Sequence, residues 1–219
     1  MWGNALRGAI TDKQIARIQQ RPREPLSLVP LFLQSSFKMV LTVALEEAVL
    51  HPDYPEISTK YIPGNGPGLT PIAKKLIDIH GNRLDLMKKT GNEYQVLSLT
   101  SPGPQGEPDV AKAEELARVC NDWIAAECKK DPKHFGAFCS LSMHRPDQAA
   151  RELRRAVKEL GLVGAILNDW QSTGKDGNGI LLYDTPDFDP FWKEVEALGV
   201  PVYFHPKVSG PRRKLPRAY

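Results

Sequence analysis

The 219-residue chain lacks the hallmarks of several protein classes. Its three cysteines, Cys120, Cys128 and Cys139, are odd in number and have spacings that suit neither a disulfide framework nor a zinc site. We therefore expect reduced cysteines in the core of a cytoplasmic protein. No apolar run reaches the length of about eighteen residues that a transmembrane helix needs. No Gly-x-Gly-x-x-Gly follows a predicted strand and no phosphate loop occurs, which disfavours a nucleotide-binding doubly wound fold.

The net charge of +3 conceals an uneven distribution. Residues 1–38 carry six Lys/Arg and two Asp/Glu, and residues 207–219 carry five Lys/Arg and no acid. Residues 39–206 carry 18 basic and 24 acidic side chains, a net of −6. An acidic body does not suit a nucleic-acid partner, which requires a basic face. We predict an N-terminal extension over 1–38, one folded domain over 39–206 and a solvated basic tail over 207–219.

The alternation of apolar and amphipathic segments predicts an α/β fold. Helical spacing of apolar residues, with capping residues and terminal glycines, predicts helices between successive strands. Strands that are apolar throughout and alternate with helices are typical of a parallel sheet covered by helices. The predicted strands are 39–45, 94–100, 135–142, 163–168 and 200–206; the predicted helices are 71–90, 110–130, 146–160 and 186–198; and the loops are 51–69 and 172–179.

Each predicted strand ends in polar or turn residues. Ligands of parallel α/β folds bind at the carboxyl ends of the strands, so these five ends define one candidate site. The carboxylate of Glu46 after the first strand and the imidazole of His205 after the fifth are donors that suit a divalent ion such as Zn or Mn. Glu47 is adjacent to Glu46 on a strand and should face the other way. His144 is predicted to anchor a loop.

Five separated motifs, in order, resemble the amidohydrolase-superfamily decarboxylases. The resemblance is to 2,3-dihydroxybenzoate, salicylate and γ-resorcylate decarboxylases, which are relatives of aminocarboxymuconate-semialdehyde decarboxylase. It covers about residues 39–206. The motifs are Val43-Ala-Leu-Glu-Glu-Ala48, Val96-Leu-Ser-Leu-Thr-Ser-Pro-Gly103, Phe135-Gly-Ala-Phe138 with Leu141-Ser-Met-His144, Ala165-Ile-Leu-Asn-Asp169 and Val200-Pro-Val-Tyr-Phe-His-Pro206.

The resemblance implies a (β/α)8 barrel that binds one divalent metal ion, Zn or Mn, with Mg as a third candidate. It assigns Glu46 and His205 as metal ligands, and places Ser101 and Asn168 where similar enzymes contact substrate. Some members have a second first-strand ligand in a Glu-x-His pattern, where this chain has Ala48. That difference favours the dihydroxybenzoate branch over γ-resorcylate chemistry.

The resemblance also implies a reaction. The metal holds the carboxylate and ortho-hydroxyl of a small aromatic acid, a ring carbon is protonated and CO₂ leaves. The family's later His-x-Gly-Glu stretch and aspartate have no counterpart here, so no catalytic residue is assigned. We expect a truncated barrel of about five of eight β/α units that is poorly active alone, with another copy of the chain as a candidate partner in a homo-oligomer. Two alternatives stay open: a hydrolase of a lactone or amide on the same scaffold, and a non-catalytic fragment that acts through association.

Overall fold

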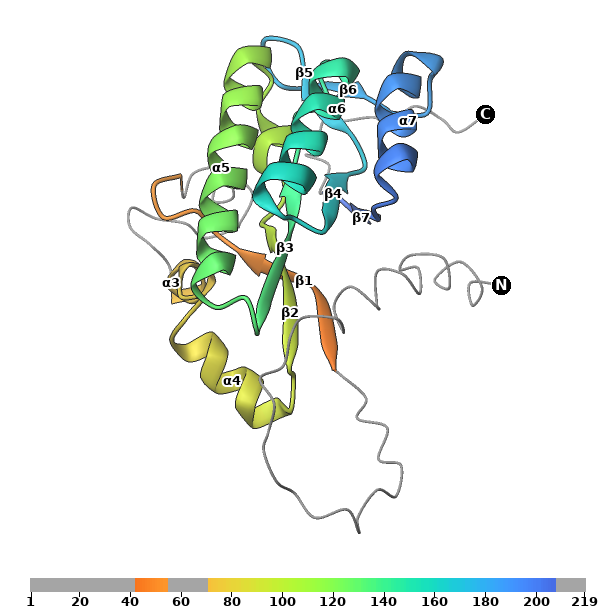
Figure 1. The fold of residues 1–219 in the computed structure, drawn as a ribbon. Coiled ribbons are helices and arrows are strands. Elements are labelled where there is room, and N and C mark those ends of the chain that lie inside the picture. Colours follow the sequence, from red (N-terminus) through yellow and green to blue (C-terminus); the bar gives the residue numbers. More distant parts are fainter. Residues whose placement is uncertain (1–41, 55–70, 208–219) are drawn as a thin grey trace, which may run out of the picture.

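The computed structural model describes residues 42–54 and 71–207 (Figure 1). The predicted extension over 1–38 therefore lies outside the described residues, as do most of the predicted 51–69 loop and the tail beyond Lys207. Lys207 itself corrects one prediction, because it is buried, with 6% of its surface exposed, and is not part of a solvated tail.

The core of the fold is a sheet of five parallel strands in the order β1-β2-β3-β4-β7. Sequence order and spatial order agree, as the prediction of successive β/α units requires, so the predicted α/β class is confirmed. The last four predicted strands are present and somewhat shorter than expected. The strands are β1 (Val43–Val49), β2 (Tyr94–Leu99), β3 (Phe135–Ser140), β4 (Gly164–Asn168) and β7 (Val202–His205).

Helices connect the strands and cover one face of the sheet (Figure 1). The last three predicted helices are confirmed. The helix predicted over 146–160 ends in a π-helical turn, and the helix predicted over 186–198 begins with a 3-10 turn. The helical elements are α3 (Pro71–Ile77), α4 (Asn82–Thr90), η2 (Gly103–Gly106), α5 (Val110–Lys130), α6 (Pro146–Arg155), η3 (Ala156–Leu160), η4 (Pro186–Phe188) and α7 (Asp189–Leu198). No helix in the described ranges is long and apolar enough to cross a membrane.

The predicted single helix over 71–90 is wrong, because the structure divides it into α3 and α4. The carboxylate of Asp78 accepts hydrogen bonds from the backbone N–H groups of Gly81 (2.8 Å) and Asn82 (2.9 Å). These donors begin a new helix and would otherwise lack partners. A local side-chain cap therefore outweighs a continuous apolar periodicity.

The predicted loop over 172–179 is also incomplete. Its two ends form a short antiparallel hairpin of β5 (Gln171–Thr173) and β6 (Gly179–Leu181). Only the turn between them, where Gly174 and Gly177 have positive φ, is loop. Three-residue strands are too short to produce a readable apolar alternation.

The two faces of the five-stranded sheet have different roles. The outer face packs against the helices in a large apolar cluster that includes Leu97, Ala137 and Leu167. The opposite, interior face carries a smaller cluster of Tyr94, Val96, Phe138 and Ile166, against which Val43, Val163 and Tyr203 pack. The sheet curls around this face, because Tyr203 on the edge strand β7 reaches Glu46 on the opposite edge strand β1.

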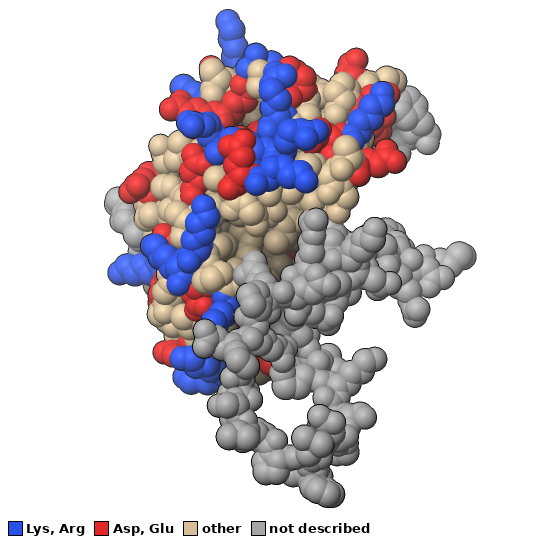
Figure 2. All heavy atoms as spheres, in the orientation of Figure 1, with Lys and Arg blue, Asp and Glu red and all other residues tan. Residues whose placement is uncertain are grey.

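The surface over the helices mixes both signs of charge. Figure 2 shows Lys and Arg side chains interspersed with Asp and Glu on the face that it presents. Several of these form ion pairs, such as those of Arg155 with Asp122 and of Arg154 with Glu194. In such pairs the two opposite charges partly neutralise one another.

Candidate active site

Glu46 owes its direction to a bulge in β1. The predicted first strand, 39–45, is wrong in its bounds, because β1 runs through both glutamates to Val49. Its pairing with β2 shifts by one residue between Ala44 and Glu47. Because side chains alternate along a strand, one extra residue reverses the facing of all that follow. Regular alternation from the interior-facing Val43 would put Glu47 inside and Glu46 outside, and the bulge exchanges them.

The bulge is held at a conformational cost. Glu46 has φ +63°, and it is the only non-glycine residue with positive φ in the described ranges. The left-handed conformation costs an L-residue roughly 1–2 kcal/mol. Strain of this kind persists where the surrounding structure stabilises it, and such residues cluster at functional sites. The bulge places a carboxylate on the interior face.

Glu46 meets two side chains of β7. His205 Nε2 lies 3.0 Å from Glu46 Oε1, and the hydroxyl of Tyr203 donates a hydrogen bond of 2.6 Å to Glu46 Oε2. This hydrogen bond, together with burial and the nearby negative charge, raises the pKa of the Tyr203 phenol. The phenol therefore stays protonated and acts as the donor near neutral pH.

The pair of Glu46 and His205 fits a divalent metal ion in donor chemistry and in spacing. Carboxylate oxygen and imidazole nitrogen are donors for both Mn²⁺ and Zn²⁺. Two donors about 2.1 Å from one ion are about 3.0 Å apart at the 90° angle of an octahedral site, which suits Mn²⁺, and about 3.4 Å apart at the tetrahedral angle that Zn²⁺ prefers. His205 Nδ1 is also buried and lacks a hydrogen-bond partner among the described residues. The described residues contain no group of three or more His, Cys, Asp or Glu that could hold a metal. The described residues therefore offer two donors at this position, fewer than the usual three or four ligands of a metal site.

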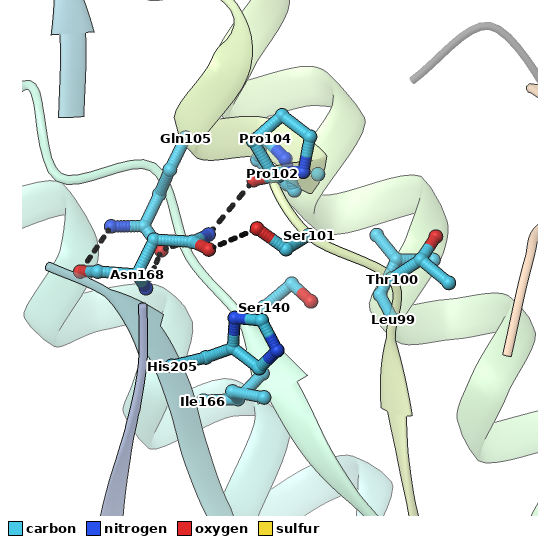
Figure 3. Close-up of a pocket in the computed structure, with 11 residues that line it drawn as sticks. Leu99, Thr100, Ser101, Pro102, Pro104, Gln105, Ser140, Ile166, Asn168 and His205 are labelled. Carbon is cyan, nitrogen blue, oxygen red and sulfur yellow. Dashed lines mark hydrogen bonds between the residues drawn. The ribbon is translucent and has the colours of Figure 1, made fainter. Parts of the chain in front are cut away.

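Ser101, Asn168 and His205 line one small pocket at the carboxyl ends of β2, β4 and β7 (Figure 3). The Ser101 hydroxyl donates to Asn168 Oδ1. The amide nitrogen of Asn168 donates to Pro102 O at 3.0 Å and to Gln105 Oε1 at 3.2 Å. Asn168 therefore fastens the segment after β2 to β4. Ser101 keeps oxygen lone pairs that can accept a further hydrogen bond.

A buried lysine anchors the chain just beyond His205. Lys207 Nζ donates to Gln105 O (2.8 Å) and Ser172 Oγ (2.7 Å), and it lies over the Trp170 ring at 5.4 Å. Its backbone N–H donates to Asp169 Oδ1 at 3.0 Å. These contacts tie the end of β7 to the segments after β2 and β4, and so hold His205 at the pocket.

Glu47 on β1 and His144 after β3 have structural roles, as predicted. Glu47 faces outward and forms an ion pair with Arg83, whose guanidinium also donates to Ala48 O. His144 Nε2 lies 3.0 Å from Glu107 O and 3.0 Å from Gln171 Nε2, so it anchors the loop after β3. Burial lowers the pKa of Arg83, while Glu47 acts in the opposite direction.

Sequence reasoning missed Tyr203, Gln105 and Lys207. Tyr203 could have been found, because it lies two residues before His205 on the same strand and must share its face. Gln105 and Lys207 follow strands in irregular segments, where no periodicity indicates which way a side chain points.

The sequence of this chain matches a known protein family. The family described as Amidohydrolase matches residues 59–216. The chain belongs to the amidohydrolase family. It is 44% identical over 165 residues to a γ-resorcylate decarboxylase of Rhizobium sp., with 75% of this chain and 50% of that protein covered. It is 32% identical over 185 residues to the 2-amino-3-carboxymuconate-6-semialdehyde decarboxylase of Dictyostelium discoideum, with 76% of this chain and 49% of that protein covered.

Solved amidohydrolase structures match the fold. The 2,6-dihydroxybenzoate decarboxylase from Rhizobium superposes with a TM-score of 0.69 at 42% identity, covering 78% of this chain and 51% of that one. A dihydroxybenzoic acid decarboxylase from Polaromonas sp., solved with manganese and the inhibitor 2-nitroresorcinol, superposes at 0.70 with 38% identity, covering 78% and 50%. The predicted partial (β/α)8 barrel is confirmed by these matches.

The chain spans about half the length of the curated relatives that it matches. Several of these relatives are γ-resorcylate decarboxylases. Alanine at position 48 led to the prediction that γ-resorcylate is a less suitable substrate. The overall sequence similarity to γ-resorcylate decarboxylases gives that prediction no support. The presence of manganese in related structures supports a divalent metal in this family of decarboxylases.

Proposed function

We propose that this chain forms part of the active site of a metal-dependent decarboxylase that acts on an ortho-hydroxybenzoate-type acid without oxidation. The observation that carries the proposal is the placement of Glu46 Oε1 and His205 Nε2, 3.0 Å apart, on the interior face of an amidohydrolase half-barrel. Relatives and solved neighbours that are decarboxylases of aromatic acids support the reaction class.

In this proposal Glu46 and His205 hold one divalent ion, manganese or zinc. The bound ion supplies Lewis-acid polarisation of the substrate's carboxylate and ortho-hydroxyl groups. Manganese in the related structures favours that metal, while the carboxylate and imidazole donors also suit zinc.

The remaining roles belong to the pocket beside His205. Asn168 fixes Ser101, and the Ser101 oxygen accepts a hydrogen bond from a substrate hydroxyl. Proton transfer to the ring carbon is assigned to none of the described residues. We further propose a cytoplasmic protein that acts as a homo-oligomer.

The test is CO₂ release from carboxyl-labelled 2,6-dihydroxybenzoate, 2,3-dihydroxybenzoate and salicylate with Mn²⁺ present. The chain is assayed alone and mixed with the half of the Rhizobium γ-resorcylate decarboxylase that it does not match. We expect little release by the chain alone, because two ligands do not complete a metal site, and clear release by the mixture. Glu46→Gln and His205→Asn should abolish that release. The matched control Glu47→Gln should keep it, because Glu47 faces the helices.

The alternatives give different outcomes. Turnover of dihydrocoumarin or an anilide by the same mixture, without CO₂ release from the acids, would favour a hydrolase. A mixture that forms a complex but releases no CO₂ would favour a non-catalytic fragment. Release that survives Glu46→Gln would contradict the proposed metal pair.

A further inference from the structure

Tyr203 and His205 hold opposite oxygens of one carboxylate. Both lie on the interior face of β7, where Tyr203 pairs in register with Ile166 and His205 with Asn168. The Tyr203 hydroxyl lies 2.6 Å from Glu46 Oε2 and His205 Nε2 lies 3.0 Å from Oε1. A single edge strand thus sets the rotation of a side chain carried by the opposite edge of the sheet.

The Tyr203 ring is partly buried and packs on one side. It stacks on Phe138 with ring centroids 6.1 Å apart and an interplanar angle of 26°, and it packs against the interior cluster that contains Val96 and Ile166. This packing restricts the movement of the Tyr203 hydroxyl. Because the hydroxyl is neutral, it orients the carboxylate without cancelling the negative charge that a metal ion requires.

We propose that Tyr203 is a positioning residue that makes Glu46 a one-oxygen ligand, occupying Oε2 so that Oε1 is presented beside His205 Nε2. The inference rests on the proposed metal-dependent function. Hydrogen bonds to metal-ligating side chains orient them, and their loss typically lowers metal affinity by about 10–100-fold. Tyr203→Phe removes one oxygen atom and keeps the ring on Phe138, so it isolates this hydrogen bond.

The experiment measures Mn²⁺ binding to the purified chain by electron paramagnetic resonance, without substrate. Tyr203→Phe is compared with the wild type, with Glu46→Gln and with the matched control Tyr54→Phe. That control removes the same atom from a phenol whose ring packs edge-on against the ring of His51. We expect Tyr203→Phe to weaken binding by about tenfold or more, Glu46→Gln to abolish it and Tyr54→Phe to change it by less than about twofold.

A second readout separates positioning from stability. The visible absorption of bound Co²⁺ reports ligand geometry, and it should change in Tyr203→Phe and persist in Tyr54→Phe. Circular dichroism with thermal unfolding checks that each variant folds. Unchanged affinity and an unchanged Co²⁺ spectrum in folded Tyr203→Phe would overturn the positioning role and leave the proposed function standing. Absence of Glu46-dependent binding in the wild type would overturn both, while failure of CO₂ release with binding intact would overturn the reaction alone.

Discussion

Replacing Ala48 with histidine should convert the proposed two-ligand metal site into a three-ligand site. Ala48 pairs with Ser98 and follows the β1 bulge, so it faces the interior, two residues after Glu46 and on the same side. A histidine there would extend toward the space beside the Glu46 carboxylate and His205.

The size of the effect follows from the ligand count. A four-ligand structural zinc site contributes about 10–16 kcal/mol, or roughly 3 kcal/mol per ligand. Glu46 and His205 together then give about 6 kcal/mol, which corresponds to a Kd of tens of micromolar. A third ligand adds about 3 kcal/mol and should tighten binding about 100-fold, to below about 1 μM.

The assay is isothermal titration of Zn²⁺ and Mn²⁺ into the wild type and the variant. Glu47→His is the matched control, because it adds the same imidazole to the face that packs against Arg83. Ala48→His should tighten metal binding and Glu47→His should not. Equal tightening by both variants would refute the assigned facing of β1, and sub-micromolar binding by the wild type would refute a site of two protein ligands.

Three further predictions concern the fold. Leu153 is fully buried, so Leu153→Ala should lower the free energy of unfolding by about 2–5 kcal/mol. Leu86 is 50% exposed, so Leu86→Ala should change that free energy by less than about 0.5 kcal/mol. Equal losses of the two variants in urea unfolding would contradict the assigned core. Burial acts to raise the pKa of Glu127, but hydrogen bonds with Lys130 and His80 outweigh it and lower that pKa. Its stabilisation is therefore present above the ordinary value of 4.5 and lost as the pH falls below it. Glu127→Gln should destabilise the chain at neutral pH and have little effect near pH 3, and an unfolding difference independent of pH would argue against this. Burial raises the pKa of the Cys120 thiol to about 12 and also raises that of Cys139, so a thiol reagent should label neither cysteine until the chain unfolds; rapid labelling of the native chain would contradict their placement.

The helices and the sheet order could be predicted because their signals are local. α5 matches its predicted range, because Asp109 accepts a hydrogen bond from Lys112 N at its start and an apolar stripe continues to its end. The break between α3 and α4 was missed. There the apolar spacing continues through Ile79, and only the side-chain cap by Asp78 interrupts the helix.

The sequence indicated which residues form the candidate site, but not how the fold brings them together. The resemblance to a family indicated Glu46, but strand alternation from Val43 alone would have turned Glu47 inward. The choice depends on a bulge whose formation requires pairing with β2, and no pattern in residues 43–49 reports it. Lys207 shows the same limit. Its charge indicated a solvated tail. In the structure, Lys207 Nζ is buried because it donates hydrogen bonds to two oxygen acceptors and lies over the Trp170 ring.

The most direct test of the proposed metal ligands, Glu46 and His205, is the position of a bound ion. Crystals of the chain soaked in Zn²⁺ should show, by anomalous diffraction at the zinc edge, one ion about 2.0–2.2 Å from both Glu46 Oε1 and His205 Nε2. Tyr203 should remain hydrogen-bonded to Glu46 Oε2. An ion bound elsewhere, with Glu46 and His205 still in direct contact, would contradict the proposed site.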